Sequence, residues 1–401
     1  MMPDIGLAAR LFDALAVATR RGRGIERDTY GAGEQAAHDI VAAAARELGL
    51  AVEIDPVGNL SMTRMGRNRT RPAVMLGSHL DSVPQGGNFD GAAGVLAGLA
   101  IVAGIKQPAC DVTVMAVRGE ESAWFDVPYI GSRAAFGDLP DEALSVRRLG
   151  DGPTLREVFD DHGFHLRPSL DPARIACWLE LHIEQGPVLL AAGLPCATVT
   201  GIRGCRRFRS ASCHGAYGHS GADPRAHRAD AVAATVALLA ALESAWLARE
   251  QTEDLVFTVG ELFTDPVMHG PSKVAGETRF VLDFRSLSDA TMDAMADTAR
   301  TLAARIGAER RVRFDLGATS HSVPALMDGQ LRAALRDAGA PFEMASGAGH
   351  DAAVFAAHGV PTGMVFVRNA NGSHNPDEAM DMADFTQATE VLGRVVEGLV
   401  A

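Results

Sequence analysis

The hydrophobic pattern of residues 73–117 alternates between apolar runs and one segment of small residues. Residues 73–79 (AVMLGSH) and 111–117 (DVTVMAV) lack the polar alternation of a half-exposed strand. Between them, residues 91–105 are rich in Ala, Gly and Leu and favour a helix. Unbroken apolar strands separated by a helix indicate a sheet that is buried on both faces. The pattern therefore predicts an α/β domain, with further central strands at residues 175–184 and 361–369.

The segment from residue 205 to residue 318 follows a different order. It predicts strands and helices in the order βαββαβ, at residues 205–214, 230–249, 254–262, 278–286, 293–307 and 310–318. This order is typical of a ferredoxin-like module, and about 110 residues suffice for a compact insertion. The α/β pattern then resumes and ends in a helix at 384–400. We predict a discontinuous first domain, residues 1–204 and 319–401, interrupted by a second domain, residues 205–318.

Length and charge narrow the class of protein. A chain of 401 residues exceeds one ordinary core, which agrees with two domains. With 50 acidic and 37 basic residues, the formal charge of -13 disfavours nucleic acid and anionic membranes as partners. No segment approaches the ~20 uninterrupted apolar residues of a membrane span. Five scattered cysteines without a C-x-x-C pair favour the cytoplasm over an oxidising compartment.

The N-terminal segment predicts a packed helix rather than a signal sequence. Leu7, Leu11 and Leu15 recur at helical spacing, and most of the arginines follow the apolar portion instead of preceding it.

Polar residues collect at the ends of the predicted strands, where open α/β sheets bind ligands. His79 and Asp81 end the first strand, and Asp90 follows a glycine-rich stretch eleven positions after His79. We expect Asp81 either to accept a hydrogen bond from His79 and so fix the tautomer of a metal-binding histidine, or to support the loop. Taken singly, an Asp at a helix start and a His at a strand end are ordinary surface features.

Two further strand ends and one turn add titratable residues. Glu120 and Glu121 follow residues 111–117, His182 lies in the strand at 175–184, and His374 lies in the polar turn NGSHNPDE. A solvated helix start, a core histidine and a surface histidine would explain each of these alone. Jointly they provide a mixed nitrogen and oxygen set that suits Zn²⁺, Mn²⁺, Co²⁺ or Ni²⁺. Two ions about 3.5 to 4 Å apart, bridged by one carboxylate, would use all five ligands.

The motifs GSHLDSVPQGGNFDGAAGV, RGEES, ELHIEQGPVL, GHSGADPRAHRADA, VLDFRS, SGAGHDA and NGSHNPDE resemble, in order, those of the M20 metallopeptidase superfamily. HIEQGPVL and SGAGHDA resemble its hydantoinase/carbamoylase amidase branch. The resemblance implies an α/β catalytic domain with a central mixed sheet flanked by helices. It also implies that a ferredoxin-like α+β lid interrupts this domain and forms a homodimer.

The resemblance also assigns roles to residues. His79, Asp90 and His182 would bind one divalent ion, Asp90, Glu121 and His374 a second, and Glu120 would be the general base. His219 of the lid would reach the oxyanion in the neighbouring subunit, or else be a polar lid residue. Arg285 would clamp a substrate carboxylate, or else form a buried structural ion pair. The residues implied to line the substrate pocket are Gln185, Gly349 and His350.

Two departures from the family pattern concern the substrate. Ser272, in PSKVAGE, replaces an asparagine that commonly helps to hold the substrate carboxylate, and SAWFDVPYIGSR replaces a glycine-containing segment. The leading prediction is a metal-dependent amidohydrolase that cleaves the carbamoyl C–N bond of an N-carbamoyl L-amino acid or of a close ureido compound. The alternatives are allantoate-type hydrolysis, deacylation of an unusual N-acyl amino acid, and a non-catalytic metal-binding relative.

Overall fold

The computed structural model describes residues 2–401. These residues form two compact units. The first unit contains the chain up to Ile202 together with Leu326–Ala401, and the second is Arg203–Ala325. The second unit thus continues beyond the boundary that the sequence indicated at residue 318. The reason is that β15 (Thr319–Ser322) pairs antiparallel with β9 (Gly204–His214), which belongs to the second unit.

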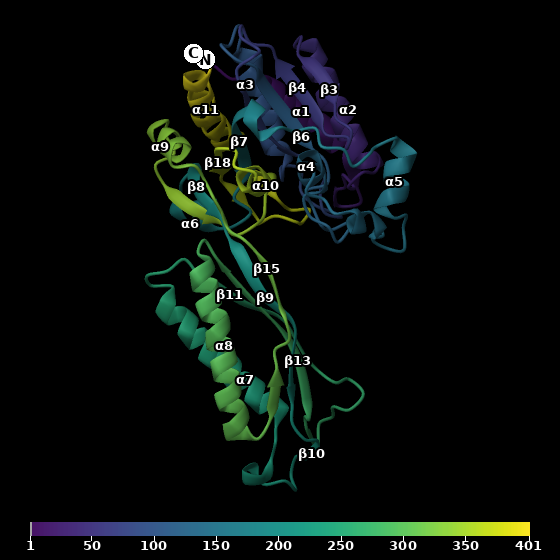
Figure 1. The fold of residues 1–401 in the computed structure, drawn as a ribbon, viewed down its shortest axis with the longest axis vertical. Coiled ribbons are helices and arrows are strands. Elements are labelled where there is room, and N and C mark those ends of the chain that lie inside the picture. Colours follow the sequence, from purple (N-terminus) through teal and green to yellow (C-terminus); the bar gives the residue numbers. More distant parts are fainter. Residues whose placement is uncertain (1) are drawn as a thin grey trace. The chain divides into compact units, whose positions relative to one another are not determined.

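A mixed sheet forms the centre of the first unit (Figure 1). Its strands lie in the order β8-β18-β7-β5-β6-β4-β3, with β17 beside β8. The inner strands β18, β7, β5 and β6 are parallel, whereas β8 and the outer pair β4 and β3 add antiparallel neighbours. The bounds are β3 (Ala51–Ile54), β4 (Leu60–Arg64), β5 (Ala73–His79), β6 (Val112–Val117), β7 (Ile175–Ile183), β8 (Cys196–Ile202), β17 (Glu343–Ser346) and β18 (Thr362–Val367).

Small residues let helix α3 (Ala92–Gly104) lie directly on this sheet. Eleven of its residues, from Ala92 to Val102, are buried. A Cβ atom on Gly94 would lie 2.3 Å from the carbonyl oxygen of Leu181 in β7, so only glycine permits this approach. The predicted apolar strands and the small-residue helix between them are therefore confirmed.

The remaining helices of the first unit complete its core. Leu7, Leu11 and Leu15 of α1 are buried, as their spacing predicted. In Figure 1 the C-terminal helix α11 lies alongside β18 and β7. The bounds are α1 (Ile5–Thr19), α2 (Ala32–Glu47), α4 (Ile130–Phe136), α5 (Leu155–His162), α6 (Val188–Ala192), α9 (Gly329–Asp337), α10 (Asp351–Ala357) and α11 (Met382–Leu399).

The second unit is an antiparallel sheet with two helices. Its strands lie in the order β11-β13-β9-β14, and the element order β9-α7-β11-β13-α8-β14 is the predicted βαββαβ. Phe208, Leu282 and Phe284 are buried with apolar residues of both helices. The bounds are α7 (Ala231–Arg249), β10 (Gly218–His219), β11 (Val256–Thr264), β12 (Lys273–Val274), β13 (Glu277–Ser286), α8 (Asp289–Arg310) and β14 (Arg313–Asp315).

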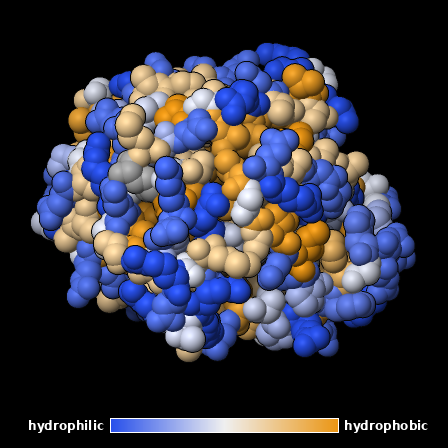
Figure 2. Space-filling view, turned by 90° about the horizontal axis from the view of Figure 1, so that it is seen from above, coloured by the Kyte–Doolittle hydropathy of each residue, from blue (hydrophilic) through white to orange (hydrophobic). Residues whose placement is uncertain are grey.

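Helix α7 bears on the expectation that no segment could span a membrane. Within residues 2–401 it is the one helix whose length and composition would allow it. Its Ala234, Leu238 and Leu242 are fully buried in the core of the second unit, and Glu243 interrupts its apolar sequence. A single helix of this kind is weak evidence for a membrane span, and one face of α7 stays exposed in the described residues. On the face seen in Figure 2, hydrophilic residues surround smaller apolar areas.

Candidate metal centre

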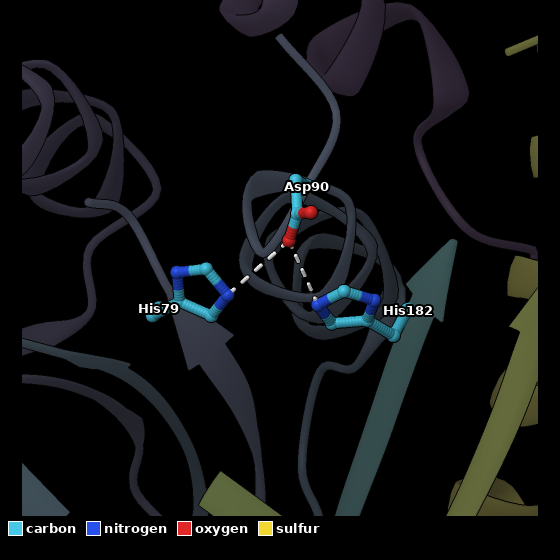
Figure 3. A group of neighbouring side chains, drawn as sticks. All are labelled: His79, Asp90 and His182. Atoms are coloured by element: carbon cyan, nitrogen blue, oxygen red, sulfur yellow. Dashed lines mark ion pairs between the residues drawn. The ribbon is translucent and has the colours of Figure 1, made fainter. Parts of the chain in front are cut away.

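His79 and His182 lie on the neighbouring strands β5 and β7 and point toward Asp90 (Figure 3). The Oδ1 atom of Asp90 is 3.5 Å from Nε2 of His79 and 3.2 Å from Nε2 of His182. The Nδ1 atoms lie within 3.1 and 2.9 Å of the backbone oxygens of Asp81 and Ile183, respectively. A hydrogen bond at Nδ1 fixes each ring so that its Nε2 faces the carboxylate.

The glycine-rich approach to Asp90 has a steric cause. Gly91, between Asp90 and α3, has φ +65°, and a Cβ atom there would lie 2.5 Å from the imidazole of His79. A Cβ atom on Gly87 would lie 2.1 Å from Oε1 of Glu378. These glycines therefore allow Asp90 to turn back toward His79.

The second carboxylate oxygen of Asp90 faces a different group of residues. Its Oδ2 atom lies 3.5 Å from Nε2 of His374, which is 3.2 Å from Oε1 of Glu121. It also accepts hydrogen bonds from Gln185 Nε2 at 2.7 Å and Ser373 Oγ at 2.5 Å. The structure thus brings the five predicted ligands together as two sets, His79/Asp90/His182 and Asp90/Glu121/His374, each with potential ligand atoms within 4.8 Å of one another.

The residues present fit divalent metal ions. Nε2 of His182 is buried without a hydrogen-bond partner among the described residues, although it faces Asp90. A neutral imidazole nitrogen, orientated toward carboxylates and otherwise unused, is a typical ligand for Zn²⁺ and similar ions.

A third cluster, Glu180/His182/His350, also has the spacing of a ligand set. There, however, the carboxylate of Glu180 is already engaged by three donors, which are Ser78 Oγ at 2.8 Å, Trp178 Nε1 at 3.1 Å and the Ala352 amide at 3.0 Å. We therefore interpret this cluster as a structural network.

Asp81 links His79 to the glutamate pair. Its carboxylate is buried, lies 3.2 Å from Nδ1 of His79 and accepts hydrogen bonds from the backbone amides of Glu120 and Glu121, each at 3.2 Å. Thr29 Oγ1 also donates to it at 2.6 Å. One buried carboxylate thereby orients both a histidine and the segment that carries the two glutamates.

Glu120 is placed as a group that exchanges a proton. Its Oε2 lies 3.9 Å from Nε2 of His79, and its carboxyl is buried. Burial raises its pKa well above the usual value, Glu121 raises it further, and His79 opposes the shift. A carboxyl with a raised pKa at a metal centre is suited to general acid and base chemistry.

The charges of the centre compensate one another. Burial lowers the pKa of His79 and His182, but neighbouring carboxylates outweigh it, and both pKa values are raised. The hydrogen bond to Glu121 raises the pKa of His374 to about 9. Burial would raise the pKa of Asp90, but His182 and His79 hold it well below its usual value. The carboxylates thus favour positive charge where ions would lie.

The predicted pocket residues of the first unit lie beside this centre. Gln185, which has φ +63°, contacts Asp90 as described above. The His350 ring centroid is 4.3 Å from that of His182, and burial lowers the pKa of His350 well below its usual value. A Cβ atom on Gly349 would lie 1.6 Å from the hydroxyl of Tyr129, so this position requires glycine.

The other predicted residues lie in the second unit. His219 is exposed, and its Nδ1 accepts hydrogen bonds from the Gly221 and Ala222 amides at 3.1 Å. Ser272 accepts a hydrogen bond from the Ser220 amide through its carbonyl oxygen at 2.9 Å. Arg285 forms a partly buried ion pair with Asp283 at 3.0 Å, and its own side chain is 36% exposed.

Sequence reasoning missed several residues that contact the centre. Ser373 Oγ lies between Asp90 and Glu378, and Glu378 accepts hydrogen bonds from the Phe89 and Asp90 amides at 2.8 and 3.3 Å. Both residues belong to the motif NGSHNPDE, so an acidic residue four positions after His374 was an available signal. Arg27 is also buried beside Asp90, and nothing in its sequence context indicated this.

Comparisons with known proteins agree with this geometry. The family model described as peptidase family M20/M25/M40 matches residues 75–398. The chain is 35% identical to an N-carbamoyl-L-amino acid amidohydrolase from Geobacillus stearothermophilus over 401 residues, covering 96% of each chain.

It is also 32% identical to an allantoate amidohydrolase from Escherichia coli strain K12, covering 86% of this chain and 85% of the relative. A solved amidase of the hydantoinase/carbamoylase family from Burkholderia multivorans superposes with a TM-score of 0.92 at 28% identity. That match covers 100% of this chain and 98% of the solved one. The resemblance drawn from the motifs is confirmed, and the chain belongs to peptidase family M20/M25/M40.

Proposed function

We propose that this protein is a metal-dependent amidohydrolase that cleaves the carbamoyl C–N bond of N-carbamoyl L-amino acids. The observation that carries the proposal is the orientation of the Asp90 carboxylate. Its Oδ1 faces His79 and His182, whereas its Oδ2 faces His374. The two sets of residues, which share Asp90, would hold two divalent ions per subunit, Zn²⁺, Mn²⁺, Co²⁺ or Ni²⁺. The names of the amidohydrolase relatives support the choice of substrate.

In this mechanism the chain's own residues handle the proton and the orientation. When bound, the ions supply Lewis acidity, which lowers the pKa of water and stabilises negative charge on oxygen. Glu120 accepts the proton of the attacking water and returns it to the leaving nitrogen, so no proton is left over. Asp81 holds Glu120 in place through its backbone amide, and the buried His350 remains neutral beside the centre. Cleavage of this one C–N bond releases one nitrogen product and leaves the other nitrogen as a carbamic acid, which breaks down to CO₂ and an amine, so the final products are the amino acid, CO₂ and ammonia.

Substrate binding completes the proposal. Arg285 offers a guanidinium that can bind the substrate carboxylate with two parallel hydrogen bonds, in competition with Asp283. Gln185, Gly349 and His350 are assigned to the pocket, and Ser272 to the position that influences carboxylate binding. The exposed Nε2 side of His219 suits a donor that stabilises an oxyanion, because its Nδ1 is occupied by two backbone amides.

We further propose a cytoplasmic homodimer that forms through the second unit, which would act as a lid. Strand β11 is at the edge of its sheet and exposes Leu262 and Phe263, while α7 exposes Val236 and Leu247. Exposed apolar side chains beside an open sheet edge favour pairing with a second copy. All five cysteines are unpaired, which supports a reducing compartment.

A substrate panel tests the proposed function. Purified protein loaded with Mn²⁺, Co²⁺ or Zn²⁺ is assayed with N-carbamoyl, N-formyl and N-acetyl L-amino acids and with allantoate, and ammonia and free amine are measured. We expect the highest kcat/KM with an N-carbamoyl L-amino acid. Preference for allantoate would support the allantoate-type alternative, which Ser272 makes relevant. Preference for an N-acyl compound would indicate a deacylase, and inactivity on the whole panel with both ions bound would favour a non-catalytic relative.

The role of His219 has a separate test. Mixed dimers that combine a His219→Ala subunit with a Glu120→Gln subunit should regain partial activity, because one composite site would keep both residues. Inactive mixed dimers would contradict a histidine that acts across the subunit boundary.

A further inference from the structure

Arg27 is a buried cation that none of the roles described above uses. It lies between β2 (Gly24–Ile25) and α2, and its relative exposure is 0%. A guanidinium without water costs free energy unless its donors are satisfied. Its three side-chain nitrogens all donate to neutral oxygen atoms, so a simple ion pair does not explain why Arg27 is buried.

The acceptors of Arg27 all belong to one loop. Nε donates to the Leu80 carbonyl at 2.5 Å, Nη1 to Asn88 Oδ1 at 3.2 Å, and Nη2 to the Asp90 carbonyl at 3.4 Å. The backbone of Arg27 pairs with Ser82, because its amide donates to Ser82 Oγ and its carbonyl accepts from the Ser82 amide, both at 2.9 Å. Arg27 therefore contacts the loop at its first residue, Leu80, two residues later at Ser82, and at its end through Asn88 and Asp90.

This loop connects two residues that face the same ion site. His79 immediately precedes Leu80, and Asp90 is the last residue that Arg27 contacts. The loop contains the adjacent glycines Gly86 and Gly87 and no helix or strand; a bridge between Gly86 and Ile25 holds its middle, but within residues 80–90, all of which are described, no backbone hydrogen bond joins its two ends. The guanidinium fork can fix the separation of these ends, because its donors point in set directions.

We propose that Arg27 is a positioning residue of the metal centre, which sets the placement of Asp90 relative to His79 by holding both ends of the connecting loop. This inference rests on the metal centre of the proposed function and extends it to a segment outside the matched family model, which begins at residue 75. Glu378 and Ser373 hold Asp90 from the opposite side, through its amide and its Oδ2.

An explanation based on charge alone makes the opposite prediction. The positive charge of Arg27 lies near Asp90, Asp81, Glu121 and Glu378, and it would repel a divalent cation. If that charge were its only influence, replacing it with a neutral side chain would strengthen ion binding. If Arg27 positions the loop, the same substitution weakens ion binding. The sign of the change therefore separates the two explanations.

The test is a calorimetric titration of metal-stripped protein with Zn²⁺ alone, using wild type, Arg27→Lys and Arg27→Gln. Arg64→Lys is the matched control, because Arg64 also donates to a backbone carbonyl, that of Leu48, but contacts none of the predicted ligands. Arg27→Lys keeps the charge and loses the fork, so we expect Zn²⁺ binding that is about 10- to 100-fold weaker at one site. Arg27→Gln should weaken binding similarly, and Arg64→Lys should bind as wild type does.

Wild-type affinity in both Arg27 variants, or tighter binding by Arg27→Gln, would overturn the inference. If Arg27→Gln does not fold, as judged by circular dichroism of the metal-free protein, Arg27→Lys alone decides the question. Failure of the wild type to bind Zn²⁺ would instead contradict the proposed metal centre itself, so the two failures are distinguishable.

Discussion

The two units carry their candidate residues in different ways. In the first unit, residues from positions 79 to 374 converge on Asp90, and His79, Asp81 and His182 are each at most 1% exposed. In the second unit, His219 and Ser272 are exposed, and Arg285 is occupied by Asp283. The first set is complete within a single unit, whereas the second set consists of separate polar groups.

From this difference we infer that the first unit holds the residues for the chemical step, and that Arg285 and Ser272 of the second unit influence which substrate is bound. Parallel strands and buried hydrogen bonds fix the geometry of His79, Asp81 and His182 before any ligand is present, as catalysis requires, whereas the side chain of His374 is half exposed. The groups of the second unit contact residues of their own unit, and any contact with a substrate has to be made when the ligand arrives. We therefore expect substitutions in the first unit to affect turnover on every substrate. Substitutions of Arg285 and Ser272 in the second unit should affect the choice among substrates, whereas His219→Ala should lower turnover.

The largest effect is expected for Glu120→Gln. The amide keeps the shape of the side chain but cannot take up a proton, so kcat should fall by about 10²- to 10⁴-fold on all substrates. Elemental analysis should find the wild-type metal content, since Glu120 is not among the predicted ligands. A wild-type kcat, or a loss that is restricted to one substrate class, would contradict its role as the general base.

A smaller and more selective effect is expected for Arg285→Leu. Loss of charged hydrogen bonds to a carboxylate should lower kcat/KM by about 10- to 100-fold for carboxylate-bearing substrates. Neutral amide analogues should be affected little. Arg279→Leu is the control, because Arg279 lies on the same strand and pairs with Glu277 in a similar way. Equal losses on charged and neutral substrates would remove Arg285 from substrate binding.

Ser272→Asn should have a modest effect in the opposite direction. It restores the amide that related proteins commonly have, and one added hydrogen bond should raise kcat/KM on N-carbamoyl amino acids by about 2- to 10-fold. Ser244→Asn, at an exposed serine of α7, serves as the control. If Ser272→Asn lowers this value while raising activity on allantoate or an N-acyl substrate, Ser272 does not have the proposed influence.

The smallest effect concerns the pH dependence of the free energy of unfolding. A buried carboxyl of the first unit, Asp351, is compared with an exposed carboxyl of the second unit, Asp297. Burial, and then Glu180, raise the pKa of Asp351 to about 7. The folded state therefore keeps a proton that the unfolded state loses near pH 4, so stability falls as the pH rises from about 4 to 7.

Asp351→Asn cannot ionise, so thermal unfolding of its metal-free form should depend less on pH in this range. Asp297→Asn, which changes an exposed carboxylate of α8, should keep the wild-type dependence. An unchanged pH dependence in Asp351→Asn would show that this carboxyl is not the source.

Sequence patterns predicted the fold well for buried elements whose burial produces a clear local pattern of apolar or small residues. The apolar run at 73–79 corresponds to β5, and the small-residue segment at 91–105 contains α3. The second compact unit ends at Ala325 rather than at residue 318, because β15, which is short and exposed, pairs with β9. Such pairing depends on a distant strand and leaves no local hydrophobic pattern.

The site was predictable where residues belong to motifs at strand ends, and less so elsewhere. His79 and His182 could be inferred because their strands end at one edge of the sheet, and Asp90 because it follows a glycine-rich stretch just before a helix. Arg27 could not, since a single arginine in a polar segment is most often exposed. Its burial follows from tertiary contacts with Leu80, Asn88 and Asp90, which no local pattern encodes.

The most direct test of the shared metal centre is the number of ions that the chain holds after equilibrium dialysis against Zn²⁺. We predict two ions per chain in the wild type, about one in His182→Ala and in His374→Ala, and none in Asp90→Ala, because only Asp90 faces both sets of ligands. Two ions retained by Asp90→Ala, or no ion bound by the wild type, would contradict the account.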